Sequence, residues 1–176
     1  MSRVPVIAVI GANHADDDVL EIAKGVGEAI ADRGFHLVCG GKGGVMTAAC
    51  RGFRFARNEL NAVRVLAIGV LPEDRADLAN EYVDLVIPTG VGIARNAIIA
   101  RMADGVVSVG GGSGTLSELA FAWQMGKPIS AMASSGGWSA QLAGQCIDRN
   151  RKDAVFSAES ANDALNHIVA QAGLDL

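Results

Sequence analysis

A glycine-rich turn between an apolar run and a helical pattern constrains this chain most. The run 106–109 (Val-Val-Ser-Val) leads into residues 110–114, of which four are glycine, and an apolar segment over 119–123 follows. This order predicts a strand, a turn and a helix. Because glycine lacks a Cβ atom, an anion can closely approach the free N–H groups at the helix start. A plain turn, the alternative, needs only one or two glycines, so the pattern favours a phosphate-binding loop.

A second glycine cluster has the same placement. Residues 35–39 form an apolar β-type run, residues 40–44 read Gly-Gly-Lys-Gly-Gly, and a helical pattern begins at Val45. In a parallel sheet both loops leave the carboxyl ends of strands, which is the edge where open α/β folds bind ligands. We therefore expect one ligand to contact both loops, through Gly40, Gly41, Gly43, Gly44, Gly111, Gly112, Ser113 and Gly114.

Strand-like and helix-like segments alternate along the whole chain. The expected strands are one that ends before Gly11 and the runs 35–39, 62–71, 83–88, 106–109, 129–133 and 155–156. The expected helices lie between residues 16 and 34, over 45–56 and 92–103, from the late glycine turn to Gly126, and over 139–147 and 160–170. Helix-length crossovers require parallel pairing with right-handed connections. The sequence therefore predicts a single α/β domain over residues 1–176, a Rossmann-like doubly wound parallel sheet of about six or seven strands with helices on both faces.

Composition supports this class and argues against several partners. Half of the residues are hydrophobic and 5% are aromatic, a balance typical of glycine-turned parallel sheets under alanine-rich helices. A net charge of -4 does not provide the basic surface of a general nucleic-acid binder. The N-terminal apolar run is too short for a signal peptide, and no run reaches the roughly 20 residues that cross a bilayer. We expect a cytoplasmic protein without nucleic-acid or membrane partners.

The metal-binding residue types show no ligand spacing, so we predict no metal site. The cysteines are odd in number and lack a C-x-x-C motif, which argues against a disulfide framework or zinc site, and we expect buried thiols at Cys39, Cys50 and Cys146. The histidines are far apart in the chain, at positions 14, 36 and 167. The consecutive acids Asp16, Asp17 and Asp18 fit a helix start better than a metal site.

Common nucleotide and hydrolase motifs are also missing. Neither Gly-Lys pair is followed by Ser or Thr, which excludes the P-loop of ATPases, and the loop after the first strand lacks G-x-G-x-x-G, which disfavours NAD. No serine lies in a G-x-S-x-G elbow. The glycine loops therefore indicate phosphate binding of another kind.

Two charged residues are placed so that their side chains could contact a ligand bound at the glycine-rich turn 110–114. Glu118, expected in the first turn of its helix, comes three positions after Thr115, so both side chains face the same side. The alternative is a helix-dipole or capping-box role for Glu118. Arg95 and Asn96 begin the preceding helix, and Arg95 is suited to bind phosphate bidentately. Arg101 lies six residues further on and points elsewhere.

These motifs resemble the LONELY GUY superfamily of Rossmann-like proteins, within the wider SLOG group. The resemblance rests on both glycine loops with Arg95 and Asn96 between them, and spans roughly residues 4–133. The segments 89–96 and 126–128 are most similar to the branch of molybdenum cofactor carrier proteins. Members of that branch bind a phosphate-bearing pterin cofactor with molybdenum for storage or transfer, without turnover.

Enzymatic members of this superfamily are nucleoside 5'-monophosphate phosphoribohydrolases that release cytokinin bases. Their P-G-G-x-G-T-x-x-E signature matches residues 110–118, with Gly110 in place of proline. The resemblance implies that Arg95 and Glu118 are a catalytic pair that needs no cofactor. Glu118 would steady the ribose hydroxyls or an oxocarbenium-like transition state, and Arg95 would assist the leaving base or orient water. The phosphate would be held by Gly111, Gly112, Gly114 and Thr115.

Two function classes follow. The first is a carrier or sensor that binds a phosphorylated nucleotide-like or pterin-like molecule, such as molybdenum cofactor or a nucleoside monophosphate. The alternative is a phosphoribohydrolase, although Ser117 stands where those enzymes commonly carry a second glutamate. The resemblance also implies a homo-oligomer, a dimer or tetramer. No cofactor-lysine motif supports a decarboxylase.

Overall fold

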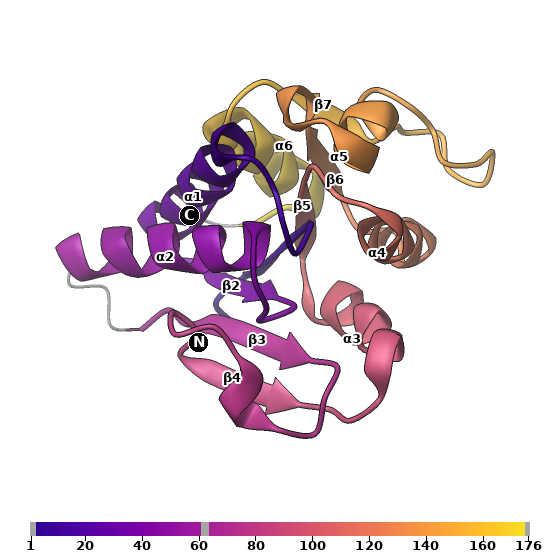
Figure 1. Ribbon diagram of the computed structural model, residues 1–176. Helices are drawn as coiled ribbons and strands as arrows, with labels where there is room; N and C mark the ends of the chain where they lie inside the picture. Colours follow the sequence, from indigo (N-terminus) through magenta and orange to yellow (C-terminus); the bar gives the residue numbers. More distant parts are fainter. Residues whose placement is uncertain (1–2, 61–63, 175–176) are drawn as a thin grey trace.

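Parallel strands form one sheet with helices packed on both faces (Figure 1). This is seen in a computed structural model that describes residues 3–60 and 64–174. The strands are β1 Val6–Gly11, β2 His36–Cys39, β3 Ala67–Leu71, β4 Leu85–Pro88, β5 Gly105–Val109, β6 Ile129–Met132 and β7 Phe156–Ala158. Their order across the sheet is β4-β3-β2-β1-β5-β6-β7. The predicted Rossmann-like doubly wound α/β fold is confirmed.

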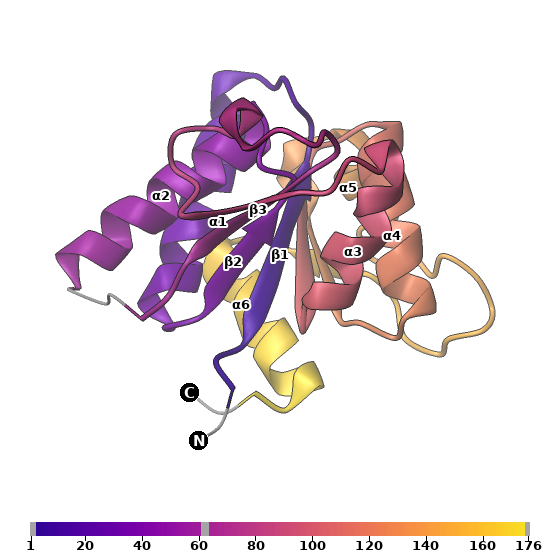
Figure 2. The ribbon, with the colours of Figure 1, turned by 90° about the horizontal axis from the view of Figure 1, so that it is seen from below.

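The helices divide evenly between the two faces. They are α1 Asp17–Asp32, α2 Val45–Glu59, α3 Arg95–Met102, α4 Ser113–Gln124, α5 Gly137–Leu142 and α6 Ala161–Ala172. Figure 2 shows α1, α2 and α6 on one side of the sheet and α3, α4 and α5 on the other. Short 3-10 turns occur at η1 Ala76–Leu78, η2 Gly92–Ala94 and η3 Ala133–Ser135.

The first strand shows why the sheet lies between two layers. Residues 6–10 of β1 are all buried. Ile7 and Val9 pack toward α1 and α2, whereas Ala8 and Ile10 pack toward α3 and α4. A strand covered on both faces is a continuous apolar run rather than an alternating one.

The strand order reverses between β1 and β5. The chain starts in β1, adds β2, β3 and β4 on one side, and then returns to place β5 on the other side of β1. In open α/β sheets, ligands bind at the carboxyl end of such a switch point. The loops that follow β1 and β5 therefore mark the expected binding edge.

Several predicted element boundaries were wrong. The strand expected over 62–71 begins at Ala67, and the preceding Leu66 N–H donates to the side-chain ring of His36 in β2 (2.9 Å) rather than to a backbone carbonyl; residues 62–63 lie outside the described part of the chain. The helix expected over 139–147 covers Gly137–Leu142, and Gly144 follows it with a φ of 75°. The helix expected over 92–103 begins as a 3-10 turn and becomes α-helical at Arg95.

Two of the cysteines are buried as expected. Cys39, at the end of β2, and Cys50, within α2, are fully buried free thiols in the core between these two elements. Cys146 is exposed, so its predicted burial was wrong. It lies in the loop after α5 rather than on a helix face, and its Sγ donates to the Asp153 carbonyl at 3.3 Å.

Candidate functional site

A cavity of about 460 Å³ opens at the carboxyl end of the sheet. Its wall is built by the loops that follow β1, β2 and β3 and by the N-terminal turns of α2, α3 and α4. The lining residues are Val9, Ile10, Gly11, Ala12, Asn13, His14, Gly40, Met46, Pro72, Ile93, Arg95, Asn96, Gly112, Ser113, Gly114, Thr115 and Glu118. The two predicted glycine loops thus reach the same cavity.

Most of the predicted site residues lie on this wall: Arg95, Glu118, Gly40, Asn96, Gly112, Ser113, Gly114 and Thr115. The remaining predicted glycines do not line it: Gly41, Gly43, Gly44 and Gly111. Two of these are needed for the backbone path. Gly111 has a φ of 99°, and a Cβ there would lie 2.4 Å from the Thr115 hydroxyl. Gly44 has a φ of 57° and would place a Cβ 2.4 Å from the Ala12 carbonyl.

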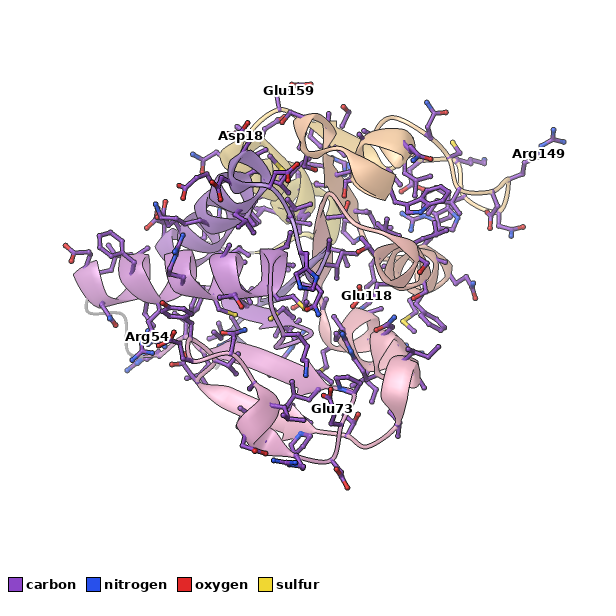
Figure 3. The ribbon with its side chains drawn as sticks, viewed as in Figure 1. Asp18, Arg54, Glu73, Glu118, Arg149 and Glu159 are labelled. Carbon is purple, nitrogen blue, oxygen red and sulfur yellow. The ribbon has the colours of Figure 1, made fainter. Side chains whose placement is uncertain are left out.

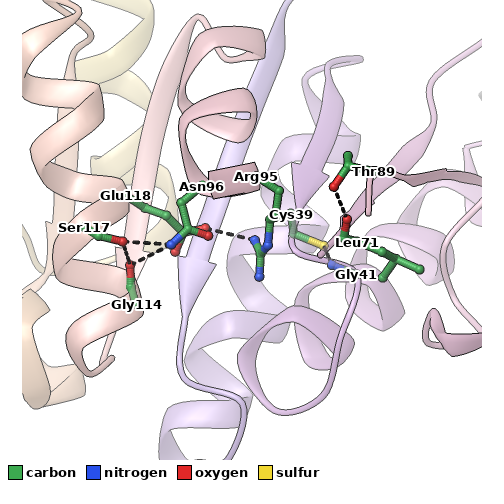
Figure 4. A network of polar contacts seen from close by, with 9 residues as sticks. All are labelled: Cys39, Gly41, Leu71, Thr89, Arg95, Asn96, Gly114, Ser117 and Glu118. Carbon is green, nitrogen blue, oxygen red and sulfur yellow. Dashed lines mark hydrogen bonds and ion pairs between the residues drawn. The ribbon is translucent and has the colours of Figure 1, made fainter. Parts of the chain in front are cut away.

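Arg95 and Glu118 form an ion pair within the cavity wall (Figure 4). Nη1 of Arg95 lies 3.2 Å from Oε1 of Glu118, and the side chains are 13% and 8% exposed. In Figure 3, Glu118 lies near the centre of the molecule, whereas Arg149 and Glu159 project from its outer edge. The sequence thus identified two residues that meet although they are 23 positions apart.

The capping-box role for Glu118 does not fit the structure. Helix α4 begins at Ser113 with Gly112 as its N-cap, so Glu118 lies in the second turn rather than the first. Thr115 is then the third helical residue and not a cap. A helix dipole acts mainly on the first turn, so neither alternative accounts for Glu118.

Burial raises the pKa of Glu118 to about 7, and the neighbouring Arg95 opposes this shift. The desolvation of a carboxylate with little solvent contact outweighs one ion pair. Near neutral pH the side chain therefore exists in both protonation states. Such a group can exchange a proton with a ligand at physiological pH.

Gly40 makes room for the guanidinium of Arg95. A Cβ atom at this position would lie 2.4 Å from Nη1 and 2.5 Å from Nη2 of Arg95. The sequence had indicated an anion-binding role for this glycine. The structure adds another, because any side chain at residue 40 would displace Arg95 from Glu118.

The start of α4 faces the cavity with open backbone. A Cβ built on Gly112 or Gly114 would meet no described atom within 4 Å, and the first turn of α4 contains no acidic residue. The first N–H groups of a helix have no intrahelical partners. This combination leaves space and hydrogen-bond donors for an anion.

Asn96 holds α3 against α4. Its Nδ2 donates to Oγ of Ser117 at 2.7 Å, and that hydroxyl donates to the carbonyl of Gly114 at 2.7 Å. Figure 4 shows this chain of contacts beside the ion pair. The Ser117 hydroxyl therefore has both of these hydrogen-bond partners within the protein, and Asn96 fixes the position of the glycine turn.

The sequence missed the loop that follows β1. Asn13 and His14 line the cavity, and Oδ1 of Asn13 accepts a hydrogen bond from the Gly43 N–H at 3.0 Å. This loop lacks the glycine pattern that marked the other two. Its position at the strand-order switch was the signal that could have identified it.

The polar segment after β3 supports the first glycine loop. Nζ of Lys42 lies 2.8 Å from Oε1 of Glu73, and this bond lowers the pKa of Glu73. The N–H of Asn80 donates to the Gly41 carbonyl at 2.8 Å. Pro72, at the start of this segment, lies on the cavity wall.

The described residues contain neither a metal-binding cluster nor a membrane-spanning helix. No group of three or more His, Cys, Asp or Glu side chains within 3–60 and 64–174 is arranged to hold a metal ion. No helix in these ranges is long and apolar enough to span a membrane.

Comparison with known protein families shows to which family this chain belongs. The sequence model of the SLOG cluster4 family matches residues 4–165. The chain belongs to this SLOG family. Its predicted resemblance to the LONELY GUY and SLOG proteins, near the carriers of molybdenum cofactor, is confirmed.

Relatives of this SLOG protein have names from both function classes. An uncharacterized protein of Archaeoglobus fulgidus is 41% identical over 126 residues, which are 72% of this chain and 78% of that protein. A cytokinin riboside 5'-monophosphate phosphoribohydrolase of Mycobacterium tuberculosis is 34% identical over 132 residues, or 70% of this chain. The match spans 63% of the mycobacterial protein, less than two thirds of its length.

Solved structures extend the similarity over nearly the whole chain. The molybdenum cofactor binding protein of Rippkaea orientalis has a TM-score of 0.82 and 32% identity, covering 97% of this chain and 98% of that one. The molybdenum cofactor carrier protein of Chlamydomonas reinhardtii has a TM-score of 0.79 and 28% identity, covering 97% and 99%. The SLOG cluster4 protein thus has the fold of these proteins.

Proposed function

We propose that this protein binds a phosphorylated nucleotide-like or pterin-like small molecule and acts as a carrier or sensor. The observation that carries the proposal is the open start of α4, where Gly112 and Gly114 leave space for an anion in front of free N–H groups. A family-level ligand-binding role is supported by the relatives. The ligand would be molybdenum cofactor or a nucleoside monophosphate.

The rest of the cavity suits a planar ring system. Its volume of about 460 Å³ lies within the usual range of small-molecule sites. Ile10, Met46, Pro72 and Ile93 supply apolar wall. A phosphate on α4 and a heterocycle against this wall would place the sugar or linker near Glu118. The name of the Rippkaea orientalis protein supports a pterin-type cofactor as one such ligand.

Replacing Gly112 with alanine tests the phosphate position. The free protein has room for the methyl group, but Gly112 is the N-cap of α4, where alanine is less favourable than glycine, so we expect the free energy of unfolding to fall by about 1 kcal/mol at most. A bound phosphate would lose its close approach, and affinity for AMP should fall roughly tenfold or more. Isothermal titration of wild type and variant measures this. Equal AMP affinities would contradict the phosphate site at α4.

A second candidate, nucleoside 5'-monophosphate phosphoribohydrolase, is favoured by the buried Arg95–Glu118 pair and by the name of the mycobacterial relative. In this reaction Glu118 would stabilise the ribose hydroxyls or the oxocarbenium-like transition state. Arg95 would assist the leaving base or orient the attacking water. The pKa of about 7 for Glu118 lets its carboxyl group change protonation state near neutral pH.

Glu118→Gln separates the two candidates. The wild-type protein is incubated with AMP and an N6-substituted AMP, and free base and ribose 5-phosphate are followed by chromatography. If the protein is a hydrolase, the variant should release base at least about a hundredfold more slowly while it still binds phosphate. Saturable binding without release in the wild type supports the carrier or sensor.

We also propose a homo-oligomer, a dimer or tetramer, located in the cytoplasm. Ile93 is 87% exposed at the edge of the cavity, and Val91 and Ile98 are 50% and 36% exposed nearby. A second copy of the chain would cover these apolar side chains.

The free thiols Cys39, Cys50 and Cys146 suit a reducing compartment. We propose no nucleic-acid or membrane partner, in line with the net charge of -4.

A further inference from the structure

Two buried thiols that the proposed function does not use lie behind the cavity wall. Cys39 ends β2 and Cys50 lies within α2, and their Sγ atoms are 3.5 Å apart. Both residues have no solvent exposure. A disulfide needs the sulfurs to approach to about 2.05 Å, so a small movement separates this contact from a covalent bond.

The surroundings give the two sulfurs different roles. The N–H of Gly41 donates to Sγ of Cys39 at 3.3 Å. A hydrogen bond with Cys50 lowers the pKa of Cys39 against the opposing effect of burial, and the Gly41 N–H and the charge of Arg95 also lower it. The same contact and burial raise the pKa of Cys50. Cys39 is therefore the better nucleophile and Cys50 the partner that keeps its proton.

This pair is directly connected to the ligand site. Cys39 precedes Gly40, whose backbone approaches the guanidinium of Arg95 so closely that a Cβ would lie 2.4 Å from Nη1. Figure 4 shows Cys39, the Gly41 N–H and Arg95 side by side. Movement of the Cys39 sulfur toward Cys50 would weaken its bond with Gly41 and shift the backbone that adjoins Arg95.

We propose that Cys39 and Cys50 form an oxidation site that takes hydrogen peroxide and yields a reversible intramolecular disulfide. The Cys39 thiolate attacks one peroxide oxygen, the O–O bond breaks, and the departing hydroxide takes a proton to become water. Cys39 is then a sulfenic acid. The Cys50 sulfur attacks the Cys39 sulfur, the S–O bond breaks, and the leaving hydroxide takes the Cys50 proton. Two thiols and one peroxide thus give one disulfide and two waters.

Neither sulfur has solvent exposure, so the oxidant must be as small as hydrogen peroxide, which is close to water in size. The disulfide would alter the cavity wall at Gly40 and disturb the pairing of Arg95 with Glu118. We expect about a tenfold loss of AMP affinity in the oxidised protein. This consequence rests on the proposed function, whereas disulfide formation does not.

The test uses the full chain with Cys146→Ser, which removes the exposed thiol. After peroxide treatment, intact mass should fall by two hydrogens, and peptide mapping should find Cys39 linked to Cys50. Dithiothreitol should restore the original mass. Cys50→Ala in the same background is the matched control and should form no intramolecular cross-link. Retention of both thiols, or sulfinic acid at Cys39 without a cross-link, would overturn the proposal.

Titration with AMP before and after oxidation tests the connection to the cavity. Weaker binding that dithiothreitol restores supports it, and unchanged affinity of the cross-linked protein overturns it. If the reduced protein does not bind AMP, the proposed function fails for this ligand. The mass and mapping results still decide whether the dithiol site exists.

Discussion

Replacing Gly27 with alanine is expected to destabilise the fold by at least about 3 kcal/mol. Helices α1 and α2 pack so closely here that a Cβ on Gly27 would lie 1.9 Å from the Ala49 carbonyl oxygen and 2.9 Å from the Phe53 nitrogen. Both are backbone atoms, so relief requires the two helices to separate. Urea unfolding of the variant and the wild type measures the change in free energy.

Gly25→Ala, two residues earlier in α1, is the matched control. A Cβ at Gly25 would meet no described atom within 4 Å. Alanine is the better helix former, so this variant should be more stable than wild type by about 0.5–1 kcal/mol. Similar effects of the two substitutions would show that α1 and α2 do not make the close contact seen here.

Glu118→Gln should make the stability of the protein less dependent on pH. A carboxyl group whose pKa rises from 4.5 to about 7 on folding binds a proton more tightly in the native state. Its stabilising contribution is complete below pH 4.5 and is lost as the pH rises through 7. Glutamine resembles the protonated form. Between pH 4.5 and pH 8, the free energy of unfolding of the variant should therefore rise relative to that of the wild type by up to about 3 kcal/mol.

Unfolding curves across this pH range provide the measurement. Glu59→Gln, at the exposed end of α2, serves as the control and should follow the wild-type pH dependence. A wild-type protein that becomes more stable relative to Glu118→Gln as the pH rises would mean that the ion pair with Arg95 outweighs burial.

The fold could be predicted because its pattern is local. Apolar runs such as 106–109 identified the strands. The turn and the helically spaced apolar residues that follow each run identified the helices that connect one strand to the next. The error at 62–71 coincides with a distant contact, in which the Leu66 N–H is bonded to the His36 ring. The short α5 depends on the left-handed conformation of Gly144. No local pattern of hydrophobicity reports these two features.

The candidate site could be predicted only in part. Arg95 and Glu118 were visible because each lies within the first two turns of a helix that follows a glycine-containing turn. The role of Gly40 was not, because it depends on where the Arg95 side chain lies in space. Asn13 and His14 were missed because their loop carries no phosphate-binding pattern, and the strand order alone brings them to the cavity.

We propose that the cavity binds a ligand through its phosphate at the start of α4. The most direct measurement is isothermal titration of the wild-type protein with AMP and with adenosine at the same ionic strength. We expect AMP to bind at least about tenfold more tightly than adenosine, and Gly112→Ala to remove most of the difference. Equal affinities of AMP and adenosine, or an advantage of AMP that Gly112→Ala leaves unchanged, would contradict this proposal.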